Sequence, residues 1–309
     1  MTTPPPLPAA VSGERREIRS AAGVLSYYTA APADAAPKSA PLLLIHSVNA
    51  AGSAYEVRPL YEHYRASRTV YALDLPGFGF SERSDRRYTP QLMTEAVQQM
   101  VREIQQRHGA AAIDALALSL SCEFLARAAT QAPAAFRTLA LVSPTGFNGA
   151  KPRLGAPGSD RGMPWLYRTF TFRLWSEAFY DLLTSPRSIR FFLEKTWGSK
   201  RIDEGLLQYD CITTRQPGAR HAPFYFVSGY LFSNDIRRVY EALTQPVWMS
   251  HGVRGDFVDY RQEAAFADRP NWKVQRFDTG ALPYFEVPAE FIASYDAFLA
   301  APMRARSSP

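Results

Sequence analysis

Short apolar runs alternate with segments of helical periodicity along most of this chain. The segments that read as strands lie at 23–30, 41–47, 69–75, 114–120, 138–144, 246–252 and 273–280. Most of them are continuous aliphatic runs, which are typical of strands buried on both faces of a parallel sheet. The alternation therefore predicts an α/β fold in which helices cover both faces of a mostly parallel sheet.

The helical segments carry start and stop signals. In the longest, Thr89 stands at the N-cap position, Pro90 at the first helical position and Gly109 directly after the end. Threonine at the N-cap satisfies a free N–H group of the first turn, and proline tolerates that turn because it has no N–H group to satisfy. Shorter helices are expected at 55–66, 121–131, 260–268 and 288–300.

The alternation stops between residues 145 and 235. This stretch is rich in arginine and aromatic residues and has helical periodicity without a strand pattern, so it predicts an inserted helical lid. The expected organisation is a disordered tail at 1–11, a core in two parts at 12–144 and 236–303, the lid at 145–235 and a second tail at 304–309.

Charge and cysteine content narrow the classes of partner. The net charge of +6 comes from scattered arginines, without the basic runs or basic-aromatic ribbons of nucleic-acid-binding proteins. Only Cys122 and Cys211 are present, and no apolar run is long enough to span a bilayer. We expect a cytoplasmic protein with a small-molecule substrate or ligand, no metal or other cofactor, no nucleic acid and no membrane as partner. The sequence gives no sign of an oligomeric state.

A serine stands where the strand 114–120 gives way directly to a helix. The sequence reads Ala117-Leu118-Ser119-Leu120-Ser121. In the pattern G-x-S-x-G, a serine at such a turn is held with its hydroxyl exposed as a nucleophile elbow. The glycines provide steric clearance, which alanine and serine reduce only slightly. A serine at a strand-helix junction is otherwise more often a helix N-cap, so the motif alone leaves both interpretations open.

Two further motifs precede this serine. One strand ends in His46-Ser47, and about thirty residues later Asp74–Ser81 has the complete pattern D-x-P-G-x-G-x-S. With the turn at Ser119, these motifs make the chain resemble the α/β-hydrolase superfamily from about residue 15 to residue 303. The resemblance implies an α/β-hydrolase fold, with a mostly parallel sheet of about eight strands flanked by helices and a helical lid inserted after Pro144.

The resemblance also assigns roles to individual residues. Ser119 matches the nucleophile, and the main-chain N–H groups of Leu120 and Val48 match the two donors of an oxyanion hole. The catalytic acid matches Asp256, in the loop after 246–252, with Asp259 as the second choice. An aspartate in such a loop is otherwise a common turn residue.

An alanine occupies the position of the family's catalytic histidine. The segment 280–288 reads GALPYFEVP, in which Gly280, Glu286 and Pro288 match the family pattern and Ala281 takes the place of the histidine. No histidine follows His251, so no shift of alignment restores the triad. Removal of the histidine of a serine hydrolase lowers turnover about 10⁶-fold, so hydrolysis at ordinary rates would require another base.

Two other histidines are candidates for that base. His46 lies beside the expected oxyanion loop, and His221 lies in the lid, from where it could fold over the site. Tyr284 follows the alanine closely, but a phenol with a pKa of about 10 is a poor base and a better hydrogen-bond donor. The remaining histidines have structural interpretations at a helix surface, a helix end and a strand end; they are His63, His108 and His251.

Two classes of function remain open. An enzyme would use Ser119 and Asp256 in altered or weak hydrolase or lyase chemistry on a small, largely apolar carbonyl compound, such as an ester, a lactone or a compound with a scissile C–C bond. A binding protein would hold a small ligand in the old active-site pocket, as in the plant gibberellin receptors, which have this fold with the histidine replaced. The presence of both Ser119 and Asp256 favours the enzyme.

Aromatic residues recur at helical spacing in the expected lid. Such a stripe indicates either an apolar ligand or, more commonly, core packing. The residues are Trp165, Tyr167, Phe170, Phe172, Trp175, Phe179 and Tyr180.

Overall fold

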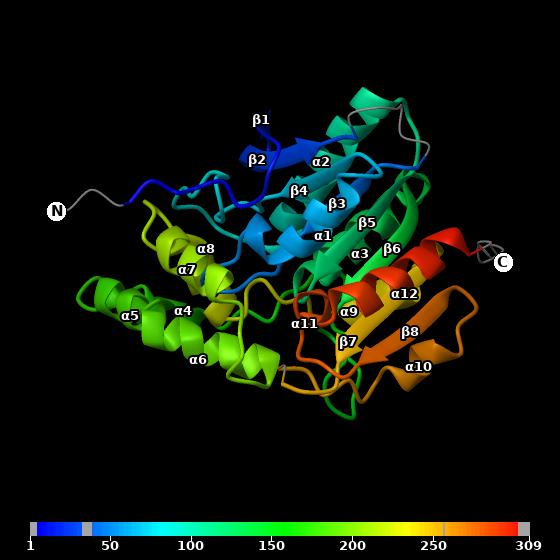
Figure 1. Ribbon diagram of the computed structural model, residues 1–309. Helices are drawn as coiled ribbons and strands as arrows, with labels where there is room; N and C mark the ends of the chain where they lie inside the picture. The colour runs from blue at the N-terminus through cyan, green and yellow to red at the C-terminus, as the bar shows by residue number, and fades with distance from the viewer. Residues whose placement is uncertain (1–4, 33–38, 256, 302–309) are drawn as a thin grey trace.

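A sheet of eight strands runs through the centre of the described residues (Figure 1). The computed structural model describes residues 5–32, 39–255 and 257–301. The strands are β1 (Glu14–Ser20), β2 (Gly23–Ala30), β3 (Leu42–Ile45), β4 (Val70–Leu73), β5 (Ile113–Leu118), β6 (Phe136–Val142), β7 (Val247–Gly252) and β8 (Trp272–Phe277). Their order is β1-β2-β4-β3-β5-β6-β7-β8, and β2 pairs antiparallel with β1 and β4 while the other pairs are parallel. The predicted mostly parallel sheet is confirmed.

Helices cover both faces of the sheet, and a further group lies beside it (Figure 1). One face carries α2 (Pro90–His108), α3 (Ser121–Gln131), α9 (Ile236–Glu241) and α10 (Ala264–Ala267); the other carries α1 (Arg58–Tyr64), α11 (Pro283–Glu286) and α12 (Pro288–Ala300). The group beside the sheet consists of α4 (Pro164–Phe170), α5 (Ser176–Leu183), α6 (Pro186–Trp197), α7 (Glu204–Thr213) and α8 (His221–Val227). Short 3-10 helices are η1 (Ala54–Val57) and η2 (Pro133–Ala135). We refer to α4–α8 as the lid.

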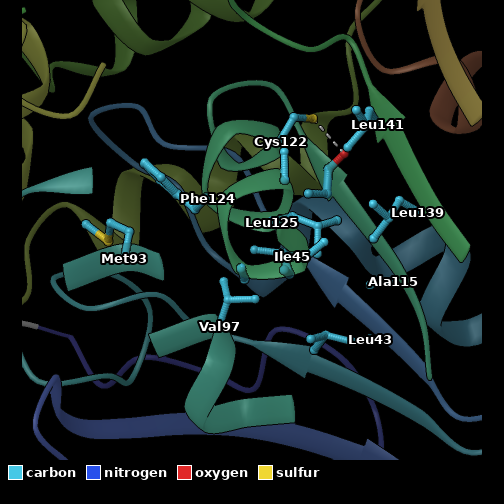
Figure 2. Close-up of a cluster of buried hydrophobic side chains, with 14 of the residues drawn as sticks. Leu43, Ile45, Met93, Val97, Ala115, Cys122, Phe124, Leu125, Leu139 and Leu141 are labelled. Atoms are coloured by element: carbon cyan, nitrogen blue, oxygen red, sulfur yellow. Dashed lines mark hydrogen bonds between the residues drawn. The ribbon is translucent and has the colours of Figure 1, made fainter. Parts of the chain in front are cut away.

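Alternate residues of the central strands belong to two separate cores. In β3, Leu43 and Ile45 pack with residues of α2 and α3, whereas Leu42 and Leu44 pack with residues of α1 and α12. Figure 2 shows the first of these cores, where Leu125 of α3 lies near Ile45. Both faces of the strand are buried, which explains its continuous apolar sequence.

The long helix α2 begins and ends where the sequence predicts. The Thr89 hydroxyl oxygen accepts a hydrogen bond from the N–H group of Leu92 at 3.1 Å, and Pro90 is the first helical residue. Gly109 follows the last turn with a φ angle of 67°, which a residue with a side chain rarely adopts. Helices α3 and α12 also coincide with the predicted segments.

The N-terminal region differs from the prediction. Residues 5–11 were expected to belong to a disordered tail, but Ala10 and Val11 are buried, and the N–H group of Ala10 donates to the Tyr28 hydroxyl at 3.1 Å. The hydroxyl of Tyr209, from the lid, donates to the carbonyl oxygen of Pro8 at 2.9 Å. A segment of proline and alanine lacks a periodic pattern, so its packing against both core and lid was not predictable from the sequence.

Candidate active site

Ser119 lies at the sharp turn between β5 and α3. Its φ angle is 54°, which is rare for a residue with a side chain, and its N–H group donates to the carbonyl oxygen of Val142 at 2.8 Å. Helix α3 is capped by Leu120 without a side-chain hydrogen bond, so Ser119 does not act as the N-cap. The half-buried Ser119 hydroxyl makes no hydrogen bond with any described residue. A strained strand-helix turn of this kind is what the nucleophile elbow predicted at Ser119 requires.

Small residues at the elbow let α3 begin close to the sheet. The buried Ser121 hydroxyl donates to the carbonyl oxygen of His46 at 2.5 Å, and the Cys122 thiol donates to that of Ala117 at 3.2 Å. Burial raises the pKa of the Cys122 thiol, so the sulfur stays protonated. Ser121 thereby joins the start of α3 to the end of β3, the strand that leads to Val48.

The main-chain N–H groups of Val48 and Leu120 have no hydrogen-bond acceptor within the part of the chain that the structure describes. In the pairing of β3 with β5, Ile45 lies opposite Ala117. Val48 follows Ile45 by three residues, and Leu120 follows Ala117 by three residues. Neither group donates to another residue of the described ranges, although both residues are almost fully buried. Buried N–H groups without a partner are rare, and one of these two belongs to the residue directly after Ser119. Such donors suit the binding of an oxyanion.

A buried carboxyl group holds the loop that carries Val48. Glu56 accepts hydrogen bonds from the N–H group of Ser47 at 2.6 Å, from the Ser47 hydroxyl at 3.0 Å and from the Asn49 amide at 2.7 Å. Burial raises the pKa of Glu56, and these donors oppose that effect. No sequence signal marked this residue, because a glutamate in a short helix is usually on the surface.

His46 has no free ring nitrogen. The N–H group of Leu75 donates to its Nε2 at 3.0 Å, so Nδ1 carries the proton and donates to the carbonyl oxygen of Ser47 at 2.5 Å. The ring is fully buried, and burial lowers the pKa of His46 to about 4. Because the neutral ring links two loops through both nitrogens, its contacts argue against His46 as a substitute base.

Ala281 lies in the loop after β8, under the end of lid helix α6. Its N–H group donates to the carbonyl oxygen of Thr196 at 2.9 Å, and its carbonyl oxygen accepts from the Ser143 hydroxyl at 2.7 Å. A Cβ atom on the neighbouring Gly280 would lie 2.4 Å from the Cα atom of Trp197. The last turn of α6 therefore rests directly on the loop that carries Ala281, the residue predicted to take the place of the family's histidine.

His221 lies at the start of α8 and faces Asp85. Its Nδ1 is 3.5 Å from the Asp85 carboxylate, and burial lowers the pKa of His221 while Asp85 partly offsets that effect. The ring lines a polar cavity of about 320 Å³ in the lid, together with Tyr180 and Arg220, and Ser119 is not among the residues that line this cavity. None of the contacts that His221 makes with the described residues involves Ser119.

Of the two candidate acids, only one lies in the described residues. Asp256 lies outside them, so its role stays a prediction. Asp259 is exposed, accepts a hydrogen bond from the N–H group of Gly149 at 2.9 Å and pairs with Arg261 at 3.2 Å. These contacts correspond to the turn role that is the usual one for a loop aspartate.

The three histidines that were expected to have structural roles each contact another side chain, through a ring nitrogen or through a contact between rings. The pairs are His251 with Glu263 (2.6 Å), His108 with Tyr71 (2.8 Å) and His63 with Tyr64 (ring centroids 4.8 Å apart).

Two further buried polar groups, Asp210 of α7 and Tyr284 of α11, lie within the electrostatic reach of Glu56. Asp210 is 3% exposed and Tyr284 is fully buried. Nevertheless, Oδ1 of Asp210 and the Tyr284 hydroxyl have no hydrogen-bond partner among the described residues. Burial raises the pKa of both groups, and the charge of Glu56 adds to the effect. Lid and core thus enclose unpaired polar atoms near the loop at Val48, where a ligand or water would satisfy them.

The described residues contain no group of three or more His, Cys, Asp or Glu side chains arranged to hold a metal ion. None of the helices in these residues has the length and apolar character required to cross a membrane.

Known proteins share this fold. The profile of the Alpha/beta hydrolase family matches residues 42–294. A probable hydrolytic enzyme from Pseudomonas aeruginosa has a TM-score of 0.70 at 20% identity, covering 96% of this chain and 96% of that one. A serine hydrolase involved in carbazole degradation has a TM-score of 0.70 at 13% identity, covering 94% of this chain and 99% of that one. The enol-lactonase from Burkholderia xenovorans has a TM-score of 0.65 at 14% identity, covering 93% of this chain and 100% of that one. No curated protein matches the sequence. At these identities, the structural matches show the fold alone.

Proposed function

Since this chain belongs to the α/β hydrolase family, we propose that it is an enzyme of the hydrolase or lyase type with an incomplete catalytic site. Ser119 and Asp256 would keep their family roles, while Ala281 stands at the position of the histidine. The substrate would be a small, largely apolar carbonyl compound, such as an ester, a lactone or a compound with a scissile C–C bond. The chemistry is expected to be slower than, or different from, that of a complete triad.

The observation that carries this proposal is a strained Ser119 combined with two buried N–H groups that lack an acceptor among the described residues. The hydroxyl is unbonded, the φ angle is 54°, and the N–H groups of Val48 and Leu120 have no partner among the described residues. Strain and unsatisfied buried donors both cost free energy of folding. A site that only binds an apolar ligand needs neither of them, so their combination supports chemistry at Ser119.

Acyl transfer at this site would begin with attack of Ser119 Oγ on the substrate carbonyl carbon, with the hydroxyl proton passing to water. Collapse of the resulting tetrahedral intermediate would then break the bond to the leaving group, which takes up a proton from water. The N–H groups of Val48 and Leu120 would stabilise the negative oxygen of the tetrahedral intermediate, and one such donor is typically worth about 10²–10³ in turnover. No histidine in the described residues hydrogen-bonds to Ser119. In a serine hydrolase without its triad, the oxyanion hole and substrate binding alone accelerate the reaction about 10³–10⁴-fold over the reaction in water. We expect an acceleration of this size, unless the substrate or Asp256 accepts the proton in place of water.

The surroundings of the elbow support an apolar substrate. Leu118, directly before Ser119, belongs to a buried cluster that also contains Trp197 of the lid, Leu282 and Tyr284. The unpaired hydroxyl of Tyr284 would supply a hydrogen bond to a polar part of the ligand. Pockets that combine apolar walls with a few polar groups are typical of small-molecule sites.

Labelling with a fluorophosphonate, read by intact mass, tests this proposal without knowledge of the substrate. We expect one adduct on the wild-type protein and none on Ser119→Ala. Ser143→Ala is the matched control, because Ser143 also has a positive φ angle, 47°, at the end of the neighbouring strand but donates its hydroxyl to Ala281. A wild-type protein that stays unlabelled while folded would contradict a nucleophilic role for Ser119.

Small-molecule binding without catalysis is the second candidate function. The hydrogen bond between Ala281 and Thr196 favours it, because the lid is joined to the loop where a catalytic histidine would otherwise act. A binding protein would give no fluorophosphonate adduct. A ligand found by thermal-shift screening would then protect the lid from hydrogen exchange, and Tyr284→Phe would weaken its affinity.

A further inference from the structure

The aromatic stripe of the lid divides into a packed part and an exposed part. Tyr167, Phe170, Phe179 and Tyr180 belong to one small cluster within the lid, as core packing predicts. The others do not pack in this way: the exposed fraction is 66% for Trp165, 47% for Phe172 and 47% for Trp175, and Leu174 between the last two is 83% exposed. Exposed apolar side chains that gather at one place mark an interaction surface.

These side chains form one continuous feature, which we call the lid tip: Trp165, Arg168, Phe172, Arg173, Leu174 and Trp175. Trp165 and Thr169 are one helical turn apart on α4, and the indole N–H of Trp175 donates to the carbonyl oxygen of Thr169 at 2.8 Å. The rings of Phe172 and Trp175 pack with their centroids 4.6 Å apart. The tip is therefore built on α4 and its link to α5, the helix at the left-hand end of the lid in Figure 1, on the side away from β7 and β8.

The charge of the lid tip is positive. Arg168 and Arg173 are exposed and form no ion pair with another residue of the described ranges. The acids of the following helix are already paired within the lid, Glu177 with Arg220 at 2.7 Å and Asp181 with Arg215 at 2.9 Å. The two free guanidinium groups thus flank exposed tryptophan, phenylalanine and leucine side chains.

We propose that the lid tip docks this protein on the surface of a lipid bilayer that contains anionic lipids. Tryptophan and phenylalanine settle at the boundary between headgroups and acyl chains, and arginines beside them reach the lipid phosphates. This proposal departs from the expectation, drawn from the sequence, that the protein has no membrane partner. It concerns association with the surface, since no described helix is suited to span a bilayer, and it does not depend on catalysis at Ser119.

The charges favour a bilayer over a second copy of the chain. In a twofold symmetric contact, Arg168 and Arg173 would face the same arginines of the other copy, because such an interface uses the same surface twice. An anionic bilayer offers the opposite charge. It also adapts to side chains that project from a helix end, and no matching shape is required.

Flotation with vesicles tests the proposal. The probes are vesicles of phosphatidylcholine alone and vesicles in which one third of the lipid is phosphatidylglycerol. We expect binding to the second kind, weaker binding to the first, and a loss at about 0.5 M salt, which screens exposed charges. Trp165→Ser combined with Leu174→Ser should weaken binding about tenfold or more, because both changes remove inserted apolar area. Arg168→Gln combined with Arg173→Gln should abolish the preference for the anionic vesicles.

A matched control uses the same residue types elsewhere on the surface. Arg153 and Leu154 are adjacent and exposed but lie outside the lid helices, and Arg153→Gln with Leu154→Ser should leave vesicle binding unchanged. Circular dichroism confirms that each variant is folded. No binding to either vesicle overturns the proposal, as does an equal loss of binding in the control. A dimer in light scattering that Leu174→Ser dissociates, without vesicle binding, assigns the tip to a second copy instead.

Discussion

The N–H group of Ala281 donates a 2.9 Å hydrogen bond to the carbonyl oxygen of Thr196, and this bond joins the loop after β8 to the last turn of α6. The carbonyl groups of a last helical turn lack partners within the helix, so the loop supplies one of the missing donors. Gly280 allows the close approach, since a Cβ atom there would meet the main chain of Trp197. The lid is thereby anchored to the loop that carries Ala281, the residue predicted to take the place of the family's histidine.

Gly280→Ala should release this anchor. The new Cβ atom would lie 2.4 Å from the Cα atom of Trp197, and main-chain atoms cannot move aside cheaply. We expect a loss of about 1–3 kcal/mol in the free energy of unfolding, together with faster hydrogen exchange in α6 while α12 keeps its protection. Gly205→Ala is the control, because the atom nearest to its Cβ would be the Tyr55 hydroxyl, at 2.4 Å, which is the movable end of a side chain and not main chain. If the amide hydrogens of α6 exchange equally fast in both variants, the contact of Gly280 with Trp197 does not hold α6 in place.

Ala281→His should create or greatly raise esterase activity. Loss of a triad histidine lowers turnover about 10⁶-fold. An imidazole ring at position 281, on a loop held by its hydrogen bond to α6, should restore part of that loss and raise turnover about 10²-fold or more. The measurement is the turnover of p-nitrophenyl esters. The gain must disappear in the double variant with Ser119→Ala. A folded Ala281→His protein without any gain would speak against the roles assigned to Ser119, Val48, Leu120 and Asp256.

Continuous apolar strands, helix caps and the strand-helix junction made the sheet and the sharp turn at Ser119 predictable, because each depends on neighbours in the sequence. The assignment of Ala281 to the position of the family's histidine rests on the pattern around it in the sequence and stays a prediction. Strand β1 was not predicted. It is an edge strand with the sequence ERREIRS, and its largely exposed, charged residues hide the strand pattern.

The polar interior of the site was not predictable, because it depends on contacts between distant segments. Glu56, Asp210 and Tyr284 come from η1, α7 and α11, and an acid on an amphipathic helix ordinarily faces water. Only their burial in the folded protein identifies them. The same holds for Thr196, whose carbonyl oxygen meets a residue 85 positions further along the chain.

The buried His46 ring should make the protein sensitive to acid. Its pKa is lowered to about 4, below the ordinary value of about 6.5, so the stability it contributes is present above pH 6.5 and is lost as the pH falls towards 4. The loss is on the order of 3 kcal/mol. In His46→Gln, whose amide oxygen can still accept from Leu75, this part of the pH dependence should vanish in urea unfolding at pH 7.5 and pH 4.5.

The comparison must be made between wild type and variant, because other groups titrate in the same range. Burial raises the pKa of Asp74 to about 6, so this carboxyl group makes the protein more stable as the pH falls. That contribution is present in both proteins and cancels in the difference. If the difference in unfolding free energy is the same at both pH values, the His46 ring does not titrate as its burial predicts.

Asp210→Asn should stabilise the protein at high pH. Burial raises the pKa of Asp210, and Oδ1 has no partner among the described residues, so ionisation of this group opposes folding. A carboxyl group with a raised pKa costs no stability below its unfolded pKa of about 4, and the cost grows as the pH rises above that value. Asparagine mimics the neutral acid, so we expect the variant to be more stable by about 1–3 kcal/mol at pH 8 and equal to the wild type near pH 4. Asp203→Asn at the N-cap of the same helix controls for the loss of an acid, since asparagine also caps well. A variant that is less stable than the wild type at pH 8 would mean that the Asp210 carboxylate has a partner, such as a bound cation or water, which the neutral amide cannot replace.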